Sequence, residues 1–284
     1  MQLRALLELC RISNLPTVWS NCWLVIWTGT FLYGVSGRSC ESAGFAKDSA
    51  LNILAVVTLL AIAMSLIYCG GMVMNDFIDR RIDAIERPRR PIPSGRVKPA
   101  AARWLAILML TTGLTISVTL ALLARDTSGA ISPGGVWFGL LIATVVGYNL
   151  LHQHVWAILL MGLCRSLIVL GCSAVMLDDH FFAERTSGLL WIGGPAATLL
   201  LYTLAISTVA RREVEPGGFG GPKAVMNMIA AMPLLDAAWL AVLLMWILSG
   251  KSGDHLPLLF LIIVGFPLLC AVLTKLGHRK VAGS

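Results

Sequence analysis

Eight apolar stretches in this chain are long enough to cross a lipid bilayer. A transmembrane helix needs roughly 17–25 mostly apolar residues to span about 30 Å of hydrocarbon. Backbone groups find no water in lipid, so spanning segments are helices or strands of a closed barrel, and continuous apolar runs without alternation exclude the barrel. The sequence therefore predicts an all-α, polytopic membrane bundle with transmembrane helices at about residues 14–35, 52–76, 104–124, 134–151, 155–177, 189–210, 224–248 and 256–275.

The composition excludes soluble classes of protein. Charged residues make up 13% and hydrophobic residues 57% of the 284 residues, whereas a soluble domain carries about 25% charged residues. An ordinary cytosolic protein, a disordered chain and a nucleic-acid-binding module are excluded despite the net charge of +7. We expect residues 1–284 to form a single transmembrane domain with no nucleic-acid partner, and the sequence does not indicate an oligomeric state.

Basic residues are concentrated in the loop between the second and third predicted helices. Eight of the 22 lie between Arg80 and Arg103. By the positive-inside rule this loop is cytoplasmic, and alternation through eight spans places both termini on the same side. We therefore expect a multi-pass protein of the plasma (inner) membrane, with both termini and the active site facing the cytoplasm.

An acidic cluster continues the second predicted helix into this basic loop. Asn75, Asp79 and Asp83 are spaced i, i+4 and i+8, and Asp76 lies three residues before Asp79. On a continuous helix all four project from nearly one face, where the carboxylates repel each other. Mg²⁺ would remove that penalty, since it accepts a few carboxylates and completes its octahedron with water and substrate phosphates. The alternative is a solvated helix end whose acids pair with nearby arginines.

The segment that follows the acidic cluster favours the metal hypothesis over this alternative. Residues Arg87–Gly95 contain Arg87, Arg89 and Arg90 together with three prolines. Arginine forks bind phosphate oxygens bidentately, and we expect the prolines to hold the segment extended. Acids that hold a divalent cation, beside arginines that hold a polyanion, predict a diphosphate site.

These motifs carry a family resemblance. Asn75-Asp76-x-x-Asp79-x-x-x-Asp83, followed by Arg87–Gly95, resembles the first signature of the UbiA superfamily of intramembrane prenyltransferases. The resemblance implies a bundle of usually nine helices around a cavity open to lipid, so eight to nine spans are expected. It also implies Mg²⁺-dependent transfer of a prenyl group from an isoprenoid diphosphate to an aromatic or other small acceptor. Weaker similarities lie in Arg11–Thr17, Asn21, Tyr148-Asn149 and Gly162–Arg165.

The second acidic signature of this family is altered here. A D-x-x-D-x-x-x-D pattern is expected between the sixth and seventh helices, but Glu213 and Glu215 are the only acids, and Arg211 and Arg212 precede them. Glu213 holds a second magnesium ion, or the arginines contact the diphosphate in place of metal, or full turnover has been lost. A divergent branch of the family with a degraded second motif, the EboC-like proteins, resembles this chain.

Polar residues inside the spans extend the predicted site. Arg165 lies about ten residues into the fifth span, where a charge costs about 2.5–3.5 kcal/mol on insertion scales. Its side chain should therefore face the bundle interior, as a diphosphate ligand or as a partner of Asp236. Asn21 binds phosphate or bonds a neighbouring helix. Tyr148 and Tyr202 flank an allylic cation or anchor the helices at the membrane interface.

The predicted site collects these residues into three groups. The predicted catalytic residues are Asn75, Asp76 and Asp79. The predicted metal ligands are Asn75, Asp76, Asp79, Asp83 and Glu213. The predicted substrate-binding residues are Arg87, Arg90, Arg165, Asn21, Tyr148, Arg211 and Tyr202.

The sequence thus predicts a membrane prenyltransferase that uses Mg²⁺ to ionise an isoprenoid diphosphate. Its partners are the prenyl diphosphate, an unidentified acceptor and membrane lipid. The alternative is a membrane carrier or binding protein for a phosphorylated or isoprenoid lipid, with a degraded second motif. A transporter should show inverted internal symmetry, and the acidic helix is not repeated in the second half of the chain.

Overall fold

The computed structural model describes residues 3–36, 50–124, 134–151, 153–154, 156–176, 189–212, 222–248 and 256–281. In these segments all regular structure is helical, which confirms the predicted fold class. The short helices are α1 (Leu3–Leu9), η1 (Ile12–Asn14), α4 (Arg80–Glu86) and η3 (Leu189–Gly193). The long helices are α2 (Leu15–Ser36), α3 (Ala50–Ile78), α5 (Pro99–Leu123), α6 (Gly134–Leu151), α7 (Ala157–Met176), α10 (Gly194–Arg212), α11 (Pro222–Leu248) and α12 (Leu256–Val281).

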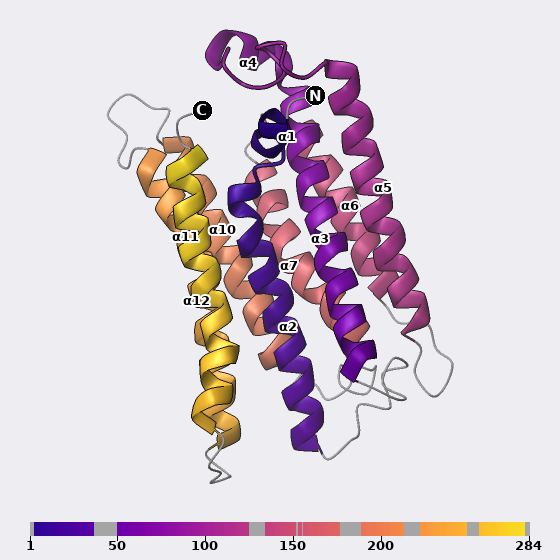
Figure 1. Cartoon of the computed structure of the whole chain (residues 1–284), viewed down its shortest axis with the longest axis vertical. Helices are drawn as coiled ribbons and strands as arrows, with labels where there is room; N and C mark the ends of the chain where they lie inside the picture. Colours follow the sequence, from indigo (N-terminus) through magenta and orange to yellow (C-terminus); the bar gives the residue numbers. More distant parts are fainter. Residues whose placement is uncertain are drawn as a thin grey trace.

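All eight predicted spans correspond to these long helices, which run side by side as a bundle (Figure 1). Judged on their described residues, seven of them, all but α2, are long and apolar enough to cross a membrane. Helix α2 has 22 residues and carries the fully buried polar side chains Thr17, Ser20 and Asn21. It packs against α3, α7, α11 and α12, so these polar groups face other helices and not lipid.

Close helix packing stabilises the half of the bundle that carries the acidic motif. Helices α3 and α5 are in extensive contact, and Gly113 of α5 lies against α3. A Cβ atom on Gly113 would lie 2.7 Å from Cγ1 of Ile67 and 2.9 Å from the carbonyl oxygen of Ala63. Glycine is therefore required for this approach, since small residues let membrane helices pack backbone to backbone.

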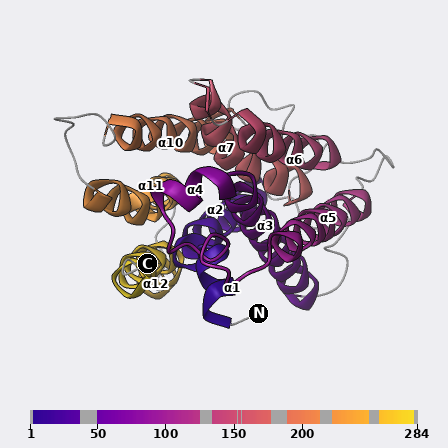
Figure 2. The ribbon, with the colours of Figure 1, turned by 90° about the horizontal axis from the view of Figure 1, so that it is seen from above.

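A cap of short elements closes one end of the bundle. Helix α4 leaves the end of α3 and lies across this end, and both chain termini are found there too (Figures 1 and 2). The two termini and the basic segment after α4 thus share one side, as the charge pattern predicts. The chain leaves the cap at Pro99, the first residue of α5. A proline in the first helical turn costs no hydrogen bond, because the N–H that it lacks would have no partner within the helix.

The segment Arg87–Gly95 is compact, so the prediction of an extended conformation is wrong. The N–H of Arg90 donates to the carbonyl of Arg87 and that of Ser94 to the carbonyl of Arg90, both at 3.0 Å. Gly95 has a φ of 75°, a left-handed conformation that glycine adopts without steric cost. Ile92 is buried beneath these turns, and burying its side chain favours folding the segment back onto the bundle over extending it.

Candidate functional site

A cavity of about 510 Å³ lies beneath the cap. Its apolar lining comes from residues well inside the helices, such as Ile67, Leu141 and Ile168, whereas its polar lining comes mainly from helix ends next to the cap. Ligand pockets commonly have this form, an apolar chamber with a few convergent polar groups. The charged and polar lining residues are Arg11, Asn14, Tyr68, Asn75, Asp79, Arg87, Arg90, Tyr148, Asn149, Arg165, Thr203, Ser207 and Arg211.

The charge of this lining is strongly positive. Five arginines line the cavity, and Asp79 is the one carboxylate among the described lining residues. Guanidinium groups cannot lose their charge in proteins and present rigid forks of N–H donors. Such a set of donors around an apolar chamber is suited to a ligand with a polyanionic head and a hydrophobic tail.

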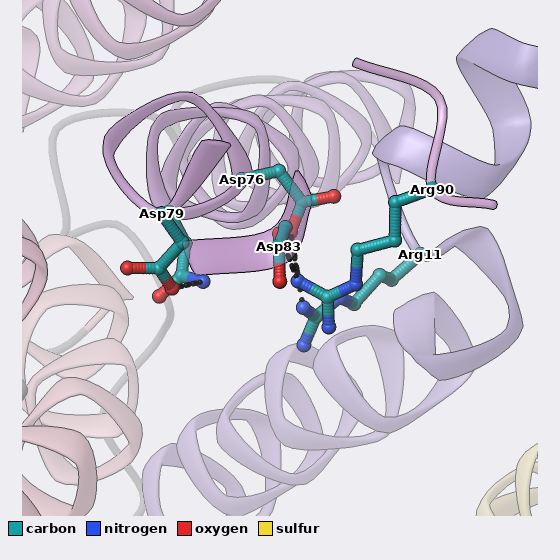
Figure 3. Close-up of polar contacts among 6 residues, drawn as sticks. Arg11, Asp76, Asp79, Asp83 and Arg90 are labelled. Atoms are coloured by element: carbon teal, nitrogen blue, oxygen red, sulfur yellow. Dashed lines mark hydrogen bonds and ion pairs between the residues drawn. The ribbon is translucent and has the colours of Figure 1, made fainter. Parts of the chain in front are cut away.

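The acidic motif divides into two pairs that face different surroundings, so the prediction of a single face is wrong. Asn75 and Asp79 face the cavity, where the Asn75 side-chain amide donates to Asp79 Oδ2 at 3.0 Å. Asp76 and Asp83 are buried and turn toward Arg11 and Arg90 (Figure 3). Arg90 donates to Asp83 Oδ2 at 2.7 Å and lies 3.3 Å from Asp76 Oδ1.

Helix geometry explains this division. Successive residues of an α-helix are about 100° apart, so Asp76 lies about 60° around the axis from Asp79 even on an ideal helix. In addition, α3 ends at Ile78 and α4 begins at Arg80, with Asp79 at the junction (φ −75°, ψ −3°). Asp83 therefore belongs to a helix with another direction, and the spacing i+8 does not place it beside Asn75.

Arg11 connects the N-terminal segment to the acidic motif, and the sequence prediction of site residues missed it. Its backbone is left-handed, with φ 46° and ψ 49°, which costs a non-glycine residue on the order of 1–3 kcal/mol. This turn directs the guanidinium to Asp76 Oδ1, 3.2 Å away. Burial is the largest single effect and lowers the pKa of Arg11, but the charge and hydrogen bond of Asp76, together with Tyr68 and Tyr148, raise the pKa above its ordinary value.

Arg165 is fixed in the cavity wall by helix α2. It donates to Thr17 Oγ1 at 2.8 Å and to Asn21 Oδ1 at 3.3 Å, and it lies 5.7 Å from the ring centre of Tyr68. Asp236 accepts hydrogen bonds from Asn21 at 2.9 Å and from Ser20 at 2.5 Å. Asn21 thus bridges Arg165 and Asp236, and it is not among the residues that line the cavity.

The remaining predicted residues differ in their relation to the cavity. Tyr148 and Arg211 line it, and Arg211 also donates to the carbonyl of His154 at 2.8 Å. Tyr202 is directed elsewhere, since its hydroxyl donates to the backbone carbonyl of Met228 on α11 at 2.9 Å. Glu213, the predicted ligand of a second metal, lies outside the described residues.

Helical periodicity could have revealed further lining residues. Tyr68 lies on the same face of α3 as Asn75, seven residues before it, and both line the cavity. On α10, Thr203 and Ser207 precede Arg211 at intervals of four residues, and all three line the cavity. Residues at these intervals share one helix face, so each known site residue predicts neighbours one and two turns away.

A magnesium ion fits the Asn75–Asp79 pair. The two side chains are in contact and face the cavity, and Mg²⁺ binds proteins through one or two carboxylates together with substrate phosphates. In the described part of the chain, no three His, Cys, Asp or Glu side chains converge on a metal position. An ion held by this pair would need water or substrate oxygens to complete its coordination.

The fold is that of a helical membrane protein, and its cavity is suited to an amphiphile with a polyanionic head. The model of the UbiA prenyltransferase family matches residues 42–282, and the chain belongs to this family. The sequence prediction of the family is thereby confirmed. None of the following relatives bears on the EboC-like branch, which stays a prediction.

Several relatives carry the name digeranylgeranylglyceryl phosphate synthase. The protein from Sulfolobus acidocaldarius is 28% identical over 215 residues, covering 76% of this chain and 64% of the relative. The protein from Sulfurisphaera tokodaii is 40% identical over 82 residues, covering 28% of this chain and 30% of the relative. The matches thus span less than two thirds of the length of these relatives.

Solved structures share the fold. A structure of digeranylgeranylglyceryl phosphate synthase matches with a TM-score of 0.52 at 19% identity, covering 99% of this chain and 92% of the other. A structure of a UbiA homologue from Aeropyrum pernix K1 without ligand matches with a TM-score of 0.51 at 16% identity, covering 93% and 97%. At these identities the similarity concerns the fold alone.

Proposed function

We propose that this protein is a membrane prenyltransferase that transfers a prenyl group from an isoprenoid diphosphate to an alcohol acceptor. The observation that carries the proposal is the cavity itself, in which five arginines and Asp79 surround the cap end of an apolar chamber. The apolar chamber suits the prenyl tail, and the arginines suit the diphosphate. Membership of the UbiA prenyltransferase family supports the same activity.

In this proposal the arginines stabilise the leaving group. Arg87 and Arg90 from the cap, Arg165 from α7 and Arg211 from α10 approach the diphosphate from different sides of the cavity. The bond between prenyl C1 and the bridging oxygen breaks, and its electron pair goes to the diphosphate. Preorganised cations in a cavity with little water stabilise such developing charge most effectively.

Asn75 and Asp79 are the residues that would hold Mg²⁺ against the diphosphate. The ion would supply Lewis-acid stabilisation of the phosphate oxygens. Asp76 and Asp83 have another role in this proposal, because both are engaged by arginines. They hold the Arg11 and Arg90 guanidinium groups at the cavity wall, where these can contact phosphate.

The tyrosines and the cap would protect the reactive cation. Tyr148 lines the cavity, and an aromatic face attracts a cation by roughly 0.5–2 kcal/mol. The segment after α4 contributes Arg87 and Arg90 to the cavity lining, and in this proposal it reduces access of water to the cation. The acceptor oxygen then forms the new bond to C1 and releases its proton to the departing diphosphate.

The names of the relatives support a particular class of acceptor. Digeranylgeranylglyceryl phosphate carries prenyl groups and a phosphate on one glycerol. We therefore propose a prenylated glyceryl phosphate as the acceptor of this protein. The arginine-rich segment after α4 supports a cytoplasmic position of the cap in the plasma membrane, with residues 1–284 acting as a single domain.

Purified protein in lipid nanodiscs tests the activity. Radiolabelled geranylgeranyl diphosphate, Mg²⁺ and a geranylgeranylglyceryl phosphate acceptor should yield a doubly prenylated lipid and release diphosphate. At the same Mg²⁺ concentration, Asp79→Asn should form much less product than the wild type while the protein remains folded. The protein could instead bind the donor but release neither product nor diphosphate with any of a set of phenolic and lipid acceptors. That result would refute the prenyltransferase hypothesis and favour the carrier hypothesis.

A further inference from the structure

A second, smaller cavity adjoins the first at its cap end. Its volume is about 250 Å³, which is below the roughly 300–1,000 Å³ typical of pockets for drug-sized ligands. It is therefore suited to a small polar head group and not to a prenyl tail. Its lining residues are Glu8, Arg11, Ser13, Asn14, Asp76, Arg89, Arg90, Pro91, Met226, Ile229 and His278.

The acids of the small cavity are engaged by arginines. Glu8 forms an ion pair with Arg96 at 2.7 Å and another with Arg4 at 3.2 Å. Asp76 is engaged by Arg11 and Arg90, as described above. The cavity therefore presents no unpaired carboxylate among its described lining residues that would repel an anion.

Arg89 supplies positive charge to this cavity alone. Its side chain forms no hydrogen bond or ion pair with another residue in the described part of the chain, and it is exposed. Arg87, only two residues earlier in the same segment, lines the large cavity and not the small one. The segment after α4 thus directs two neighbouring arginines into two different cavities.

The floor of the small cavity is formed by tight packing of α12 against η1. A Cβ atom on Gly277 would lie 3.0 Å from Cβ of Ser13, so glycine allows this approach. The next residue, His278, forms a hydrogen bond with Asn14 Oδ1. Both Ser13 and His278 line the cavity, and this packing fixes their positions before a ligand arrives.

The two cavities share one wall. Arg11, Asn14, Arg90 and Ile229 line both of them. An anion in the small cavity would therefore lie next to a diphosphate in the large one, with the guanidinium groups of Arg11 and Arg90 between the two. Shared cations of this kind hold two anionic substrates close together and reduce the repulsion between them.

We propose that the small cavity binds the phosphate group of the acceptor, a phosphate monoester of a polyol. Arg89, Arg11 and Arg90 provide the guanidinium donors, and Ser13 provides a hydroxyl. Guanidinium forks match phosphate oxygens bidentately. This inference rests on the proposed prenyl transfer, because it assigns the second substrate of that reaction to a position beside the first.

A binding experiment tests the site without turnover. Protein in neutral phosphatidylcholine nanodiscs is titrated calorimetrically with sn-glycerol 1-phosphate, inorganic phosphate and inorganic diphosphate. We expect Arg89→Gln to weaken glycerol phosphate binding about tenfold, since it removes charge-assisted hydrogen bonds to the phosphate, and to leave diphosphate binding unchanged. The matched variant Arg87→Gln should weaken diphosphate binding and leave glycerol phosphate binding unchanged.

Three outcomes would overturn the assignment. Equal affinity for inorganic phosphate and glycerol phosphate would show that the site does not recognise an acceptor. Loss of glycerol phosphate binding in nanodiscs of anionic phosphatidylglycerol would assign the site to bulk lipid head groups. Equal effects of Arg87→Gln and Arg89→Gln on both ligands would show a single anion site and not two.

Kinetics separate a failure of this inference from a failure of the proposed activity. If the protein transfers prenyl groups, Arg89→Gln should raise the KM for the acceptor and leave the KM for the prenyl diphosphate unchanged. Transfer activity with no change in the acceptor KM would overturn the small site and leave the activity standing. Arg89-dependent glycerol phosphate binding in a protein without transfer would overturn the activity and leave the site standing.

Discussion

The division of the acidic motif predicts that Asp83→Asn and Asp79→Asn have different defects. Asp83 is 3% exposed and accepts a 2.7 Å hydrogen bond from Arg90. Asparagine keeps the shape and an acceptor oxygen but removes the charge. A charge-assisted hydrogen bond is about twice as strong as a neutral one and is worth about 1.5–3 kcal/mol, so the change should cost about 1.5 kcal/mol.

This loss should appear in substrate binding, because Arg90 lines the cavity. About 1.4 kcal/mol corresponds to a factor of ten in an equilibrium constant, so the KM for the prenyl diphosphate should rise about tenfold in Asp83→Asn. The Mg²⁺ concentration for half-maximal rate should stay that of the wild type. Asp79→Asn should instead raise that Mg²⁺ concentration strongly, because Asp79 faces the cavity beside Asn75.

The assay is prenyl transfer in nanodiscs with separate titrations of Mg²⁺ and prenyl diphosphate. Binding of Mn²⁺, followed by electron paramagnetic resonance, provides a readout that does not need turnover. Asp83→Asn should bind Mn²⁺ like the wild type in the presence of inorganic diphosphate. If Asp83→Asn shifts the metal requirement as much as Asp79→Asn does, Asp83 is a metal ligand and the reasoning fails.

Two further predictions concern the packing that supports the site. Gly113→Ala should lower the melting temperature, since its Cβ would lie 2.7 Å from Cγ1 of Ile67 and overpacking typically costs about 1–3 kcal/mol. The matched control Gly139→Ala places no atom within 4 Å of the added Cβ, so its melting temperature should equal that of the wild type. If neither variant changes the melting temperature, the close packing of α5 against α3 is contradicted. Asp236→Ala removes the hydrogen-bond acceptor of Ser20 and Asn21 on α2. It should lower the free energy of unfolding by about 2–3 kcal/mol, which a thermal melt would show as a lower transition temperature. A transition temperature equal to that of the wild type would show that this buried cluster contributes nothing to stability.

The long helices could be predicted from the sequence because their signal is local. An apolar stretch must form its hydrogen bonds within itself in lipid, and the predicted span 134–151 coincides with α6. The inward direction of Arg165 follows from the cost of a charge in lipid. Its partners do not follow, since the contacts with Thr17 and Asn21 join residues 148 and 144 positions apart.

The ion pairs of the site could not be predicted, because they depend on backbone geometry and tertiary contacts. Spacing placed four polar residues on one face, but the helix changes direction at Asp79. One of the two arginine partners of Asp76 is Arg11, 65 residues earlier, which reaches Asp76 through a left-handed turn that its sequence context does not suggest. The charge pattern revealed that the arginines lie near the acids, and only the structure assigns each pair.

The central claim is that the arginine-lined end of the large cavity holds the diphosphate of a prenyl donor. A structure of the protein in nanodiscs with a non-hydrolysable geranylgeranyl thiodiphosphate and Mg²⁺ tests it most directly. We expect both phosphates within hydrogen-bond distance of Arg87, Arg90 and Arg165, a metal ion at Asn75 and Asp79, and the tail in the apolar chamber. A diphosphate bound outside this cavity, or an empty cavity at saturating analogue, would contradict the account.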